Sequence, residues 1–107
     1  MAALGAEKKA RRPRLLHVGP LTSYTDYLLL LSATSDRHAR ALADFLASEI
    51  KRTARVRALG VEGVEGGQWI LLDFGDVVVH VMQETTRKYY DLDGLWVDAE
   101  EVALADS

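Results

Sequence analysis

The pattern of apolar and polar positions predicts a buried strand followed directly by a helix. Residues 27–31 form a continuous apolar run, which is typical of a strand buried on both faces. Thr34 or Ser35 can cap a helix beginning there, and Asp36 suits the positive end of its dipole. Helical spacing then predicts one apolar stripe that packs against a sheet, formed by Ala39, Leu42, Ala43, Leu46 and Ile50.

Residues 69–82 contain two β-rich runs on either side of Phe74-Gly75, which predicts a hairpin. A two-residue turn would pair Asp73 with Asp76 and Trp69 with His80. The period of two along a strand then assigns an aliphatic face to Ile70, Leu72, Val77, Val79 and Val81. The opposite face would carry Trp69, Leu71, Asp73, Asp76, Val78, His80 and Met82. We expect the first face to be core and the second to be either a recognition surface or half-exposed sheet.

Weaker patterns predict the remaining elements. A short helix is expected over residues 2–12, ended by Pro13, with strands at 14–18 and 55–59 and a glycine-rich loop at 60–67. One or two helical turns are expected at 85–90. The acidic residues beyond Val97 predict a loosely ordered tail. The chain is thus expected to be a single α/β (α+β) domain over residues 1–98, with an acidic C-terminal tail at 99–107.

Composition narrows the class of protein. A chain of 107 residues, 49% hydrophobic and 27% charged, is the size of one globular domain. No apolar stretch approaches the roughly 20 residues that cross a bilayer, and the polar, basic start does not resemble a secretory signal. The absence of cysteine excludes disulfides and thiolate metal sites. These features predict a cytoplasmic protein without membrane association.

The net charge of −3 hides a strong asymmetry along the chain. Residues 1–60 carry 11 Lys and Arg against 5 Asp and Glu, whereas residues 61–107 carry 2 against 11. A basic half is consistent with a nucleic-acid partner and an acidic half with a basic protein partner. The alternative is that both halves are simply solvated surface.

The sequence carries no pattern for nucleophilic or metal-dependent catalysis. The histidines at positions 17, 38 and 80 have no ligand spacing, no Gly-x-Ser-x-Gly motif occurs, and no Lys-Ser/Thr follows the glycines of residues 60–67. Asp91 and Asp93 are spaced to hold Mg²⁺ for nucleotidyl transfer, but no phosphate-binding loop accompanies them. We therefore predict no metal, cofactor, small-molecule substrate or enzymatic activity.

Several motifs, taken in order, resemble the ribosomal silencing factor family, also called Iojap-like proteins. They are Asp26-Tyr27 before the buried strand, Ser35-Asp36-Arg37 at the helix start, Glu62-Gly63, the whole hairpin from Trp69 to His80, Arg87, Tyr89-Tyr90-Asp91-Leu92, and Leu95-Trp96. The resemblance covers residues 14–98. It implies a mixed five-stranded sheet with flanking helices, related to the nucleotidyltransferase fold but without its catalytic signature.

The resemblance also implies a function. Such a protein would repress translation by binding large-subunit ribosomal protein L-fourteen and sterically blocking association with the small subunit. Because organellar relatives act in large-subunit assembly, a role on immature particles is the alternative, and a nucleotidyltransferase-like enzyme is a more remote one. A homodimer off the ribosome also remains open.

The family pattern predicts a partner-binding surface at Trp69, Asp73, Asp76, His80, Tyr89, Tyr90, Asp91, Leu92 and Trp96. The aromatic and aliphatic members would form its desolvated centre, with domain core as the alternative for Trp96. Asp73, Asp76, Asp91 and Asp93 would face basic residues of the partner. The chain departs from the family at its N-terminus, where the helix is shorter and Arg11-Arg12-Pro13-Arg14 is basic. These arginines are candidates for a peripheral contact with ribosomal RNA.

Overall fold

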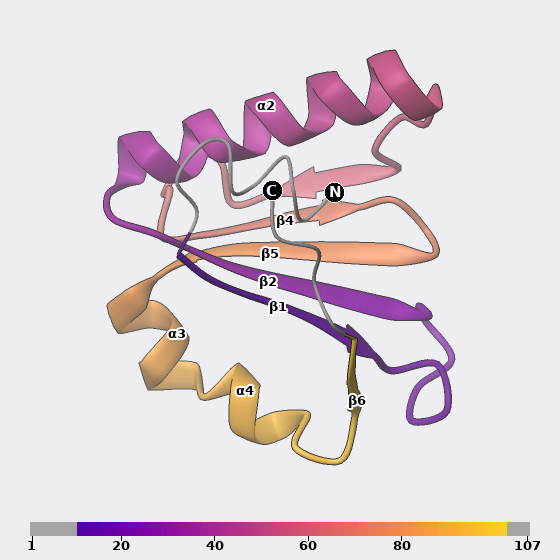
Figure 1. The fold of residues 1–107 in the computed structure, drawn as a ribbon. Helices are drawn as coiled ribbons and strands as arrows, with labels where there is room; N and C mark the ends of the chain where they lie inside the picture. The colour runs from indigo at the N-terminus through magenta and orange to yellow at the C-terminus, as the bar shows by residue number, and fades with distance from the viewer. Residues whose placement is uncertain (1–10, 103–107) are drawn as a thin grey trace.

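The computed structural model describes residues 11–102, which form a mixed sheet of six strands rather than the predicted five. The strands are β1 (Arg11–His17), β2 (Tyr27–Ala33), β3 (Gly60–Glu62), β4 (Trp69–Asp73), β5 (Val77–Gln83) and β6 (Glu100–Val102). Their order across the sheet is β3-β4-β5-β2-β1-β6 (Figure 1). The central pair, β2 and β5, is parallel, and the other neighbours are antiparallel. The single α+β domain is confirmed, while the relation to the nucleotidyltransferase fold stays a prediction.

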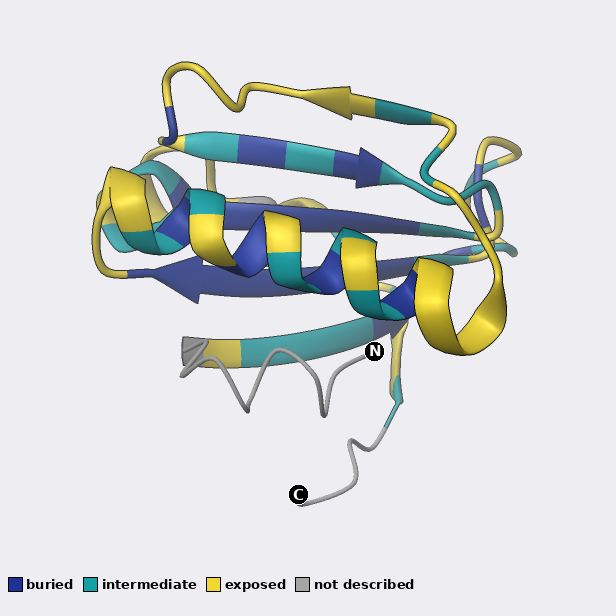
Figure 2. Cartoon of the chain, turned by 90° about the horizontal axis from the view of Figure 1, so that it is seen from above, coloured by how far each residue is buried: buried dark blue, intermediate teal, exposed yellow. Residues whose placement is uncertain are grey.

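Helix α2 (Asp36–Ala54) lies across one face of the sheet (Figure 1). Ser35 caps it: the Ser35 hydroxyl oxygen accepts a hydrogen bond of 3.0 Å from the backbone N–H of His38. The five residues of the predicted apolar stripe are all buried, and they form the dark band along the sheet side of the helix in Figure 2. The helix and its core-facing residues are therefore confirmed. No helix among residues 11–102 is long and apolar enough to cross a membrane.

Strand β2 separates two hydrophobic cores. Leu29 and Leu31 point into the core beneath α2, whereas Leu28 and Leu30 point into a second core on the opposite face. This division explains the continuous apolar run, since neither face of the strand meets water. Helix α3 (Glu84–Tyr90) and the single turn α4 (Leu92–Leu95) lie on the side of the second core (Figure 1).

The hairpin of β4 and β5 forms with a register two residues away from the predicted one. Trp69 lies opposite Met82 and Asp73 opposite Val78, because the turn is centred on Gly75-Asp76, one residue later than predicted. The Phe74 N–H closes this turn with a hydrogen bond of 2.9 Å to the carbonyl oxygen of Val77. A shift by two preserves which face each side chain occupies, so the aliphatic face packs under α2 as predicted. On the other face, Val78, His80 and Met82 are buried, and only part of that face remains accessible.

Three predicted segments are corrected. Residues 55–59 are not a strand, and β3 instead forms inside the predicted loop, where it pairs with β4. Residues 100–102 of the predicted tail form β6 by pairing with β1. Of the predicted helix, residues 2–10 lie outside the described residues, while Arg11 and Arg12 belong to β1. Pro13 cannot donate to a ladder, and the register shifts at this point between Arg11 and Arg14.

An ion-pair network joins the two ends of the described chain. The buried Arg87 guanidinium donates to both carboxylate oxygens of Asp93, at 3.0 and 2.9 Å, and to the Ser32 hydroxyl and the Arg12 carbonyl oxygen. Arg14 donates to Asp93 at 2.7 Å and to Glu101 at 2.9 Å. Hydrogen bonds from Arg87, and then from Arg14, hold the pKa of the Asp93 carboxyl well below its usual range. The Asp93 carboxylate, which was predicted to face a partner, is hydrogen-bonded to arginines of its own chain, and its contact with a partner stays a prediction.

Candidate functional site

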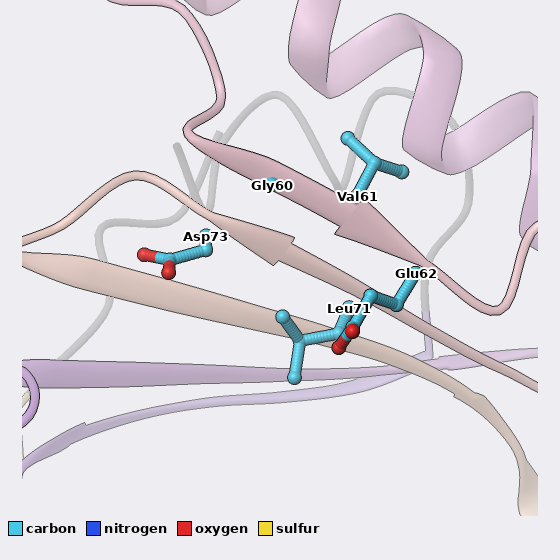
Figure 3. Close-up of a pocket in the computed structure, with 5 residues that line it drawn as sticks. All are labelled: Gly60, Val61, Glu62, Leu71 and Asp73. Atoms are coloured by element: carbon cyan, nitrogen blue, oxygen red, sulfur yellow. The ribbon is translucent and has the colours of Figure 1, made fainter.

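The accessible part of the second face forms a shallow groove along β4, next to the end of α3. We call it the β4 groove and define it by Glu62, Trp69, Leu71, Asp73, Tyr89 and Tyr90. Two hollows of about 350 and 310 Å³ lie along β4 and share Glu62 and Leu71, and a third of about 320 Å³ lies beside Tyr89 and Tyr90. Figure 3 shows the first hollow, where Leu71, Asp73 and Glu62 project to the same side of the sheet and Val61 points the other way, toward α2.

Trp69 is the central aromatic residue of the groove, and His80 fixes its position. The indole N–H of Trp69 donates a hydrogen bond of 2.9 Å to Nδ1 of His80 on the neighbouring strand β5. His80 is buried, and this burial lowers its pKa to about 4. The imidazole is therefore neutral near pH 7, with Nδ1 available as the acceptor. His80 positions Trp69 and does not itself present a surface for contact.

Two tyrosines extend the aromatic surface from β4 onto α3. The rings of Trp69 and Tyr90 are 4.9 Å apart between centroids, and those of Tyr90 and Tyr89 are 5.0 Å apart in an edge-to-face arrangement. Tyr90 remains 55% exposed and Tyr89 81% exposed. Side chains so large and so exposed are typical of a surface that a partner covers.

The predicted carboxylates do not form one cluster. Asp73 ends β4 inside the groove, and its Oδ1 accepts a hydrogen bond of 2.8 Å from the backbone N–H of Gly75. Asp76 is exposed in the hairpin turn, where its backbone carbonyl accepts hydrogen bonds from the N–H groups that begin β2. Asp91 is exposed after α3, and its Oδ1 accepts a hydrogen bond of 3.2 Å from the Gly94 N–H. Acids therefore lie within the groove and beyond both of its ends.

Trp96 lies apart from the groove. It packs against the second core, and its ring meets that of Tyr24 at a centroid distance of 6.5 Å, edge to face. The exposed side chains of Leu95 and Val97 flank it. Leu92 begins α4, and the structure describes its backbone but not the placement of its side chain. The surface predicted from the sequence thus divides into the β4 groove and a separate position around Trp96.

The carboxylates of Asp91 and Asp93 are both engaged by hydrogen bonds within the chain. Both oxygens of Asp93 accept hydrogen bonds from arginines, and Asp91 caps the turn that leads into α4. Among residues 11–102, no group of three or more histidine or acidic side chains is arranged to hold a metal ion.

The comparison with protein families decides the assignment. The sequence model described as ribosomal silencing factor during starvation matches residues 1–107. The chain belongs to the ribosomal silencing factor family. Members of this family are ribosome-binding factors and not enzymes.

Three similar proteins support the assignment. A ribosomal silencing factor of Chromobacterium violaceum is 42% identical over 81 residues, which are 76% of this chain and 66% of that protein. A mouse protein named for mitochondrial assembly of the ribosomal large subunit is 33% identical over 99 residues, 90% of this chain and 43% of that protein. A crystal structure of a Chromobacterium violaceum protein superposes with a TM-score of 0.84 at 35% identity, covering 97% of this chain and 85% of the other. The chain thus spans about two thirds of the bacterial relative and less than half of the mouse one.

Sequence reasoning placed Leu71 on the correct face but omitted it, together with Glu62, from the candidate site. Leu71 lines two of the three hollows, as Glu62 does. The sequence could have identified Leu71, because residues two apart on a strand point to the same face and Leu71 lies between Trp69 and Asp73. Glu62 could not be placed, since the pairing of β3 with β4 was not predicted.

Proposed function

We propose that this ribosomal silencing factor represses translation by binding large-subunit ribosomal protein L-fourteen through the β4 groove. Occupation of that site would sterically exclude the small subunit. The observation that carries the proposal is the aromatic series that runs from the half-buried Trp69 to the exposed Tyr90 and Tyr89. Large aromatic residues are the side chains that most often dominate the energy of protein interfaces.

The charges around the groove support a basic protein partner. Glu62 and Asp73 line it, and the exposed residues Asp76 and Asp91 lie beyond its two ends. Acids at the rim of an interface accelerate encounter with a positively charged surface, whereas buried apolar contacts contribute most of the affinity. We assign Trp69, Tyr89, Tyr90 and Leu71 to the centre of the interface and the carboxylates to its rim.

Co-sedimentation with purified ribosomal subunits tests the proposal. We expect the protein to bind isolated large subunits, not small ones, and to inhibit subunit joining in proportion to its occupancy. The variant Tyr89→Ala/Tyr90→Ala should weaken binding on the order of 100-fold, since each contact residue of this type costs roughly 1–2 kcal/mol or more. Asp76→Arg should mainly slow association.

A matched control separates the groove from a general effect of charge. Glu100→Arg introduces the same change at an exposed position of β6, on the sheet edge farthest from β3, and should leave binding unaltered. A folded triple variant Asp76→Arg/Tyr89→Ala/Tyr90→Ala that binds large subunits normally would refute the groove as the interface.

Large-subunit assembly is the second candidate function, favoured by the similarity to the mouse protein named for that process. An assembly factor would use the same groove but act on immature particles. Comparing mature subunits with assembly intermediates from a strain lacking the protein distinguishes the two. Preferential binding to intermediates, with no inhibition of joining, would favour assembly over silencing.

A further inference from the structure

The C-terminal end of α2 and the segment that follows it carry a dense group of cations. Lys51, Arg52, Arg55 and Arg57 are all exposed and lie within seven consecutive residues. Arg52 pairs with Glu49 at 2.5 Å on the preceding turn. The other three make no ion pair within residues 11–102. We call Lys51, Arg55 and Arg57 the α2 basic patch.

The arginines singled out at the N-terminal side behave differently. Arg12 pairs with Glu84 at 2.8 Å, and Arg14 pairs with both Asp93 and Glu101. Their positive charges are therefore balanced inside the domain, and those two residues are poor candidates for a nucleic-acid contact. Among the described cations without an ion pair, three gather on the α2 basic patch, whereas Arg37, Arg40 and Lys88 lie singly elsewhere in the chain.

The patch is joined to the Asp73 end of the β4 groove by the backbone. After Arg57 the chain enters β3, and the N–H of Leu59 donates a hydrogen bond of 2.6 Å to the carbonyl oxygen of Asp73. A macromolecule seated in the groove therefore brings its neighbouring surface close to the patch. On a ribosomal subunit, the anionic surface that such cations would meet is the phosphate backbone of RNA.

We propose that the α2 basic patch binds the phosphate backbone of RNA next to the protein partner held in the groove. This inference rests on the proposed ribosomal docking and adds a second contact to it. The patch contains three cations and no aromatic side chain, so it can neutralise phosphates but has no ring on which bases could stack. The contact is thus independent of base sequence and weakens as salt concentration rises.

The first test uses a short RNA duplex as a probe and is independent of the groove. In a titration followed by amide chemical shifts, the largest changes should fall on residues 51–57 and disappear at high salt. Arg57→Gln should reduce them, whereas Arg37→Gln removes the same charge from an exposed site in the first turn of α2 and should not.

The second test measures binding to large subunits between about 50 and about 200 mM salt. Each lost phosphate contact should reduce the slope of log affinity against log salt by about 0.7–0.9, so Lys51→Gln/Arg57→Gln should reduce it by about 1.5. An unchanged slope together with duplex shifts outside residues 51–57, or no shifts, would overturn the inference. Shifts at the patch in a protein that does not bind large subunits would uphold the inference and refute the proposed function.

Discussion

Arg87 and Asp93 form a two-pronged ion pair with hydrogen bonds of 3.0 and 2.9 Å. The Arg87 side chain is 0% exposed and that of Asp93 is 21% exposed. Arg87 belongs to α3, which supplies the tyrosines of the β4 groove, and Asp93 belongs to α4. Through Arg14, the same carboxylate is connected to β1 and β6. The pair therefore anchors the groove's helical side to the strands at the other edge of the sheet.

Replacing Asp93 by Asn should destabilise the fold strongly. The buried Arg87 cation would lose its counter-charge, and breaking such a pair costs on the order of 3–5 kcal/mol of unfolding free energy. Urea denaturation measures this loss. Asp98→Asn removes the same charge from an exposed turn and should change stability by less than about 0.5 kcal/mol. Equal losses of unfolding free energy in the two variants would show that the Arg87–Asp93 ion pair makes no specific contribution to stability.

His80 should make the fold sensitive to mild acid. Burial lowers its pKa to about 4 from an ordinary value of 6.5, so between these values the unfolded chain binds a proton that the folded protein does not. Stability should therefore fall as the pH drops from 6.5 toward 4, by at most about 1.4 kcal/mol per pH unit. His80→Asn should remove this dependence. Thermal melting at a series of pH values tests it, and a variant with the same slope as the wild type would contradict the expectation.

The hydrogen bond between Trp69 and His80 should support binding to the large subunit. Any side chain at position 80 that accepts this bond should be sufficient. His80→Leu leaves the indole N–H without a partner, which costs roughly 1–3 kcal/mol, and it frees Trp69 to leave its position beside Tyr90. His80→Asn offers a carbonyl oxygen close to the position of Nδ1. Large-subunit affinity should fall about 10-fold in the leucine variant and recover in the asparagine variant. Equal affinities of the two folded variants would show that the hydrogen bond does not position the groove.

Gly63 should be essential for the geometry of the groove. Its φ is +83°, and an added Cβ would collide with the backbone carbonyl oxygen of Trp69. Gly63→Ala should therefore cost roughly 1–3 kcal/mol of stability and displace the start of β4. Gly66→Ala is the matched control, since a Cβ there meets only one atom, the Gly63 carbonyl oxygen at 4.0 Å. If the two alanine variants melt alike, the close approach at Gly63 is not a constraint.

Elements with a strong local pattern were predictable from the sequence. Helix α2 combines an N-cap at Ser35 with an apolar stripe, and both are properties of neighbouring residues. The faces of the hairpin were also predicted correctly despite the wrong register. A register shift of two residues leaves the side chains of Trp69 and His80 on the same face of the sheet. The exposed tyrosines of α3 followed from family resemblance, and the structure places Tyr90 against Trp69.

Features that depend on distant residues were not predictable. Strand β3 is glycine-containing, and β6 is acidic, so each is a strand only because a partner from elsewhere in the chain is beside it. Arg14 and Arg87 meet Asp93 through the same long-range pairing, and nothing in the sequence distinguishes that carboxylate from its exposed neighbour Asp91. The burial of His80 likewise depends on how the second core closes over β5.

The pairing of β1 with β6 has a practical consequence for measurement. Val102 lies opposite Leu15, so both ends of the described chain belong to the sheet edge farthest from β3 and β4. A tether or fluorophore joined after β6 would therefore be attached at the opposite edge of the sheet from the β4 groove. Immobilising the protein by its C-terminal side should leave the groove facing the solution, which is the orientation needed to time single binding events with whole ribosomal subunits.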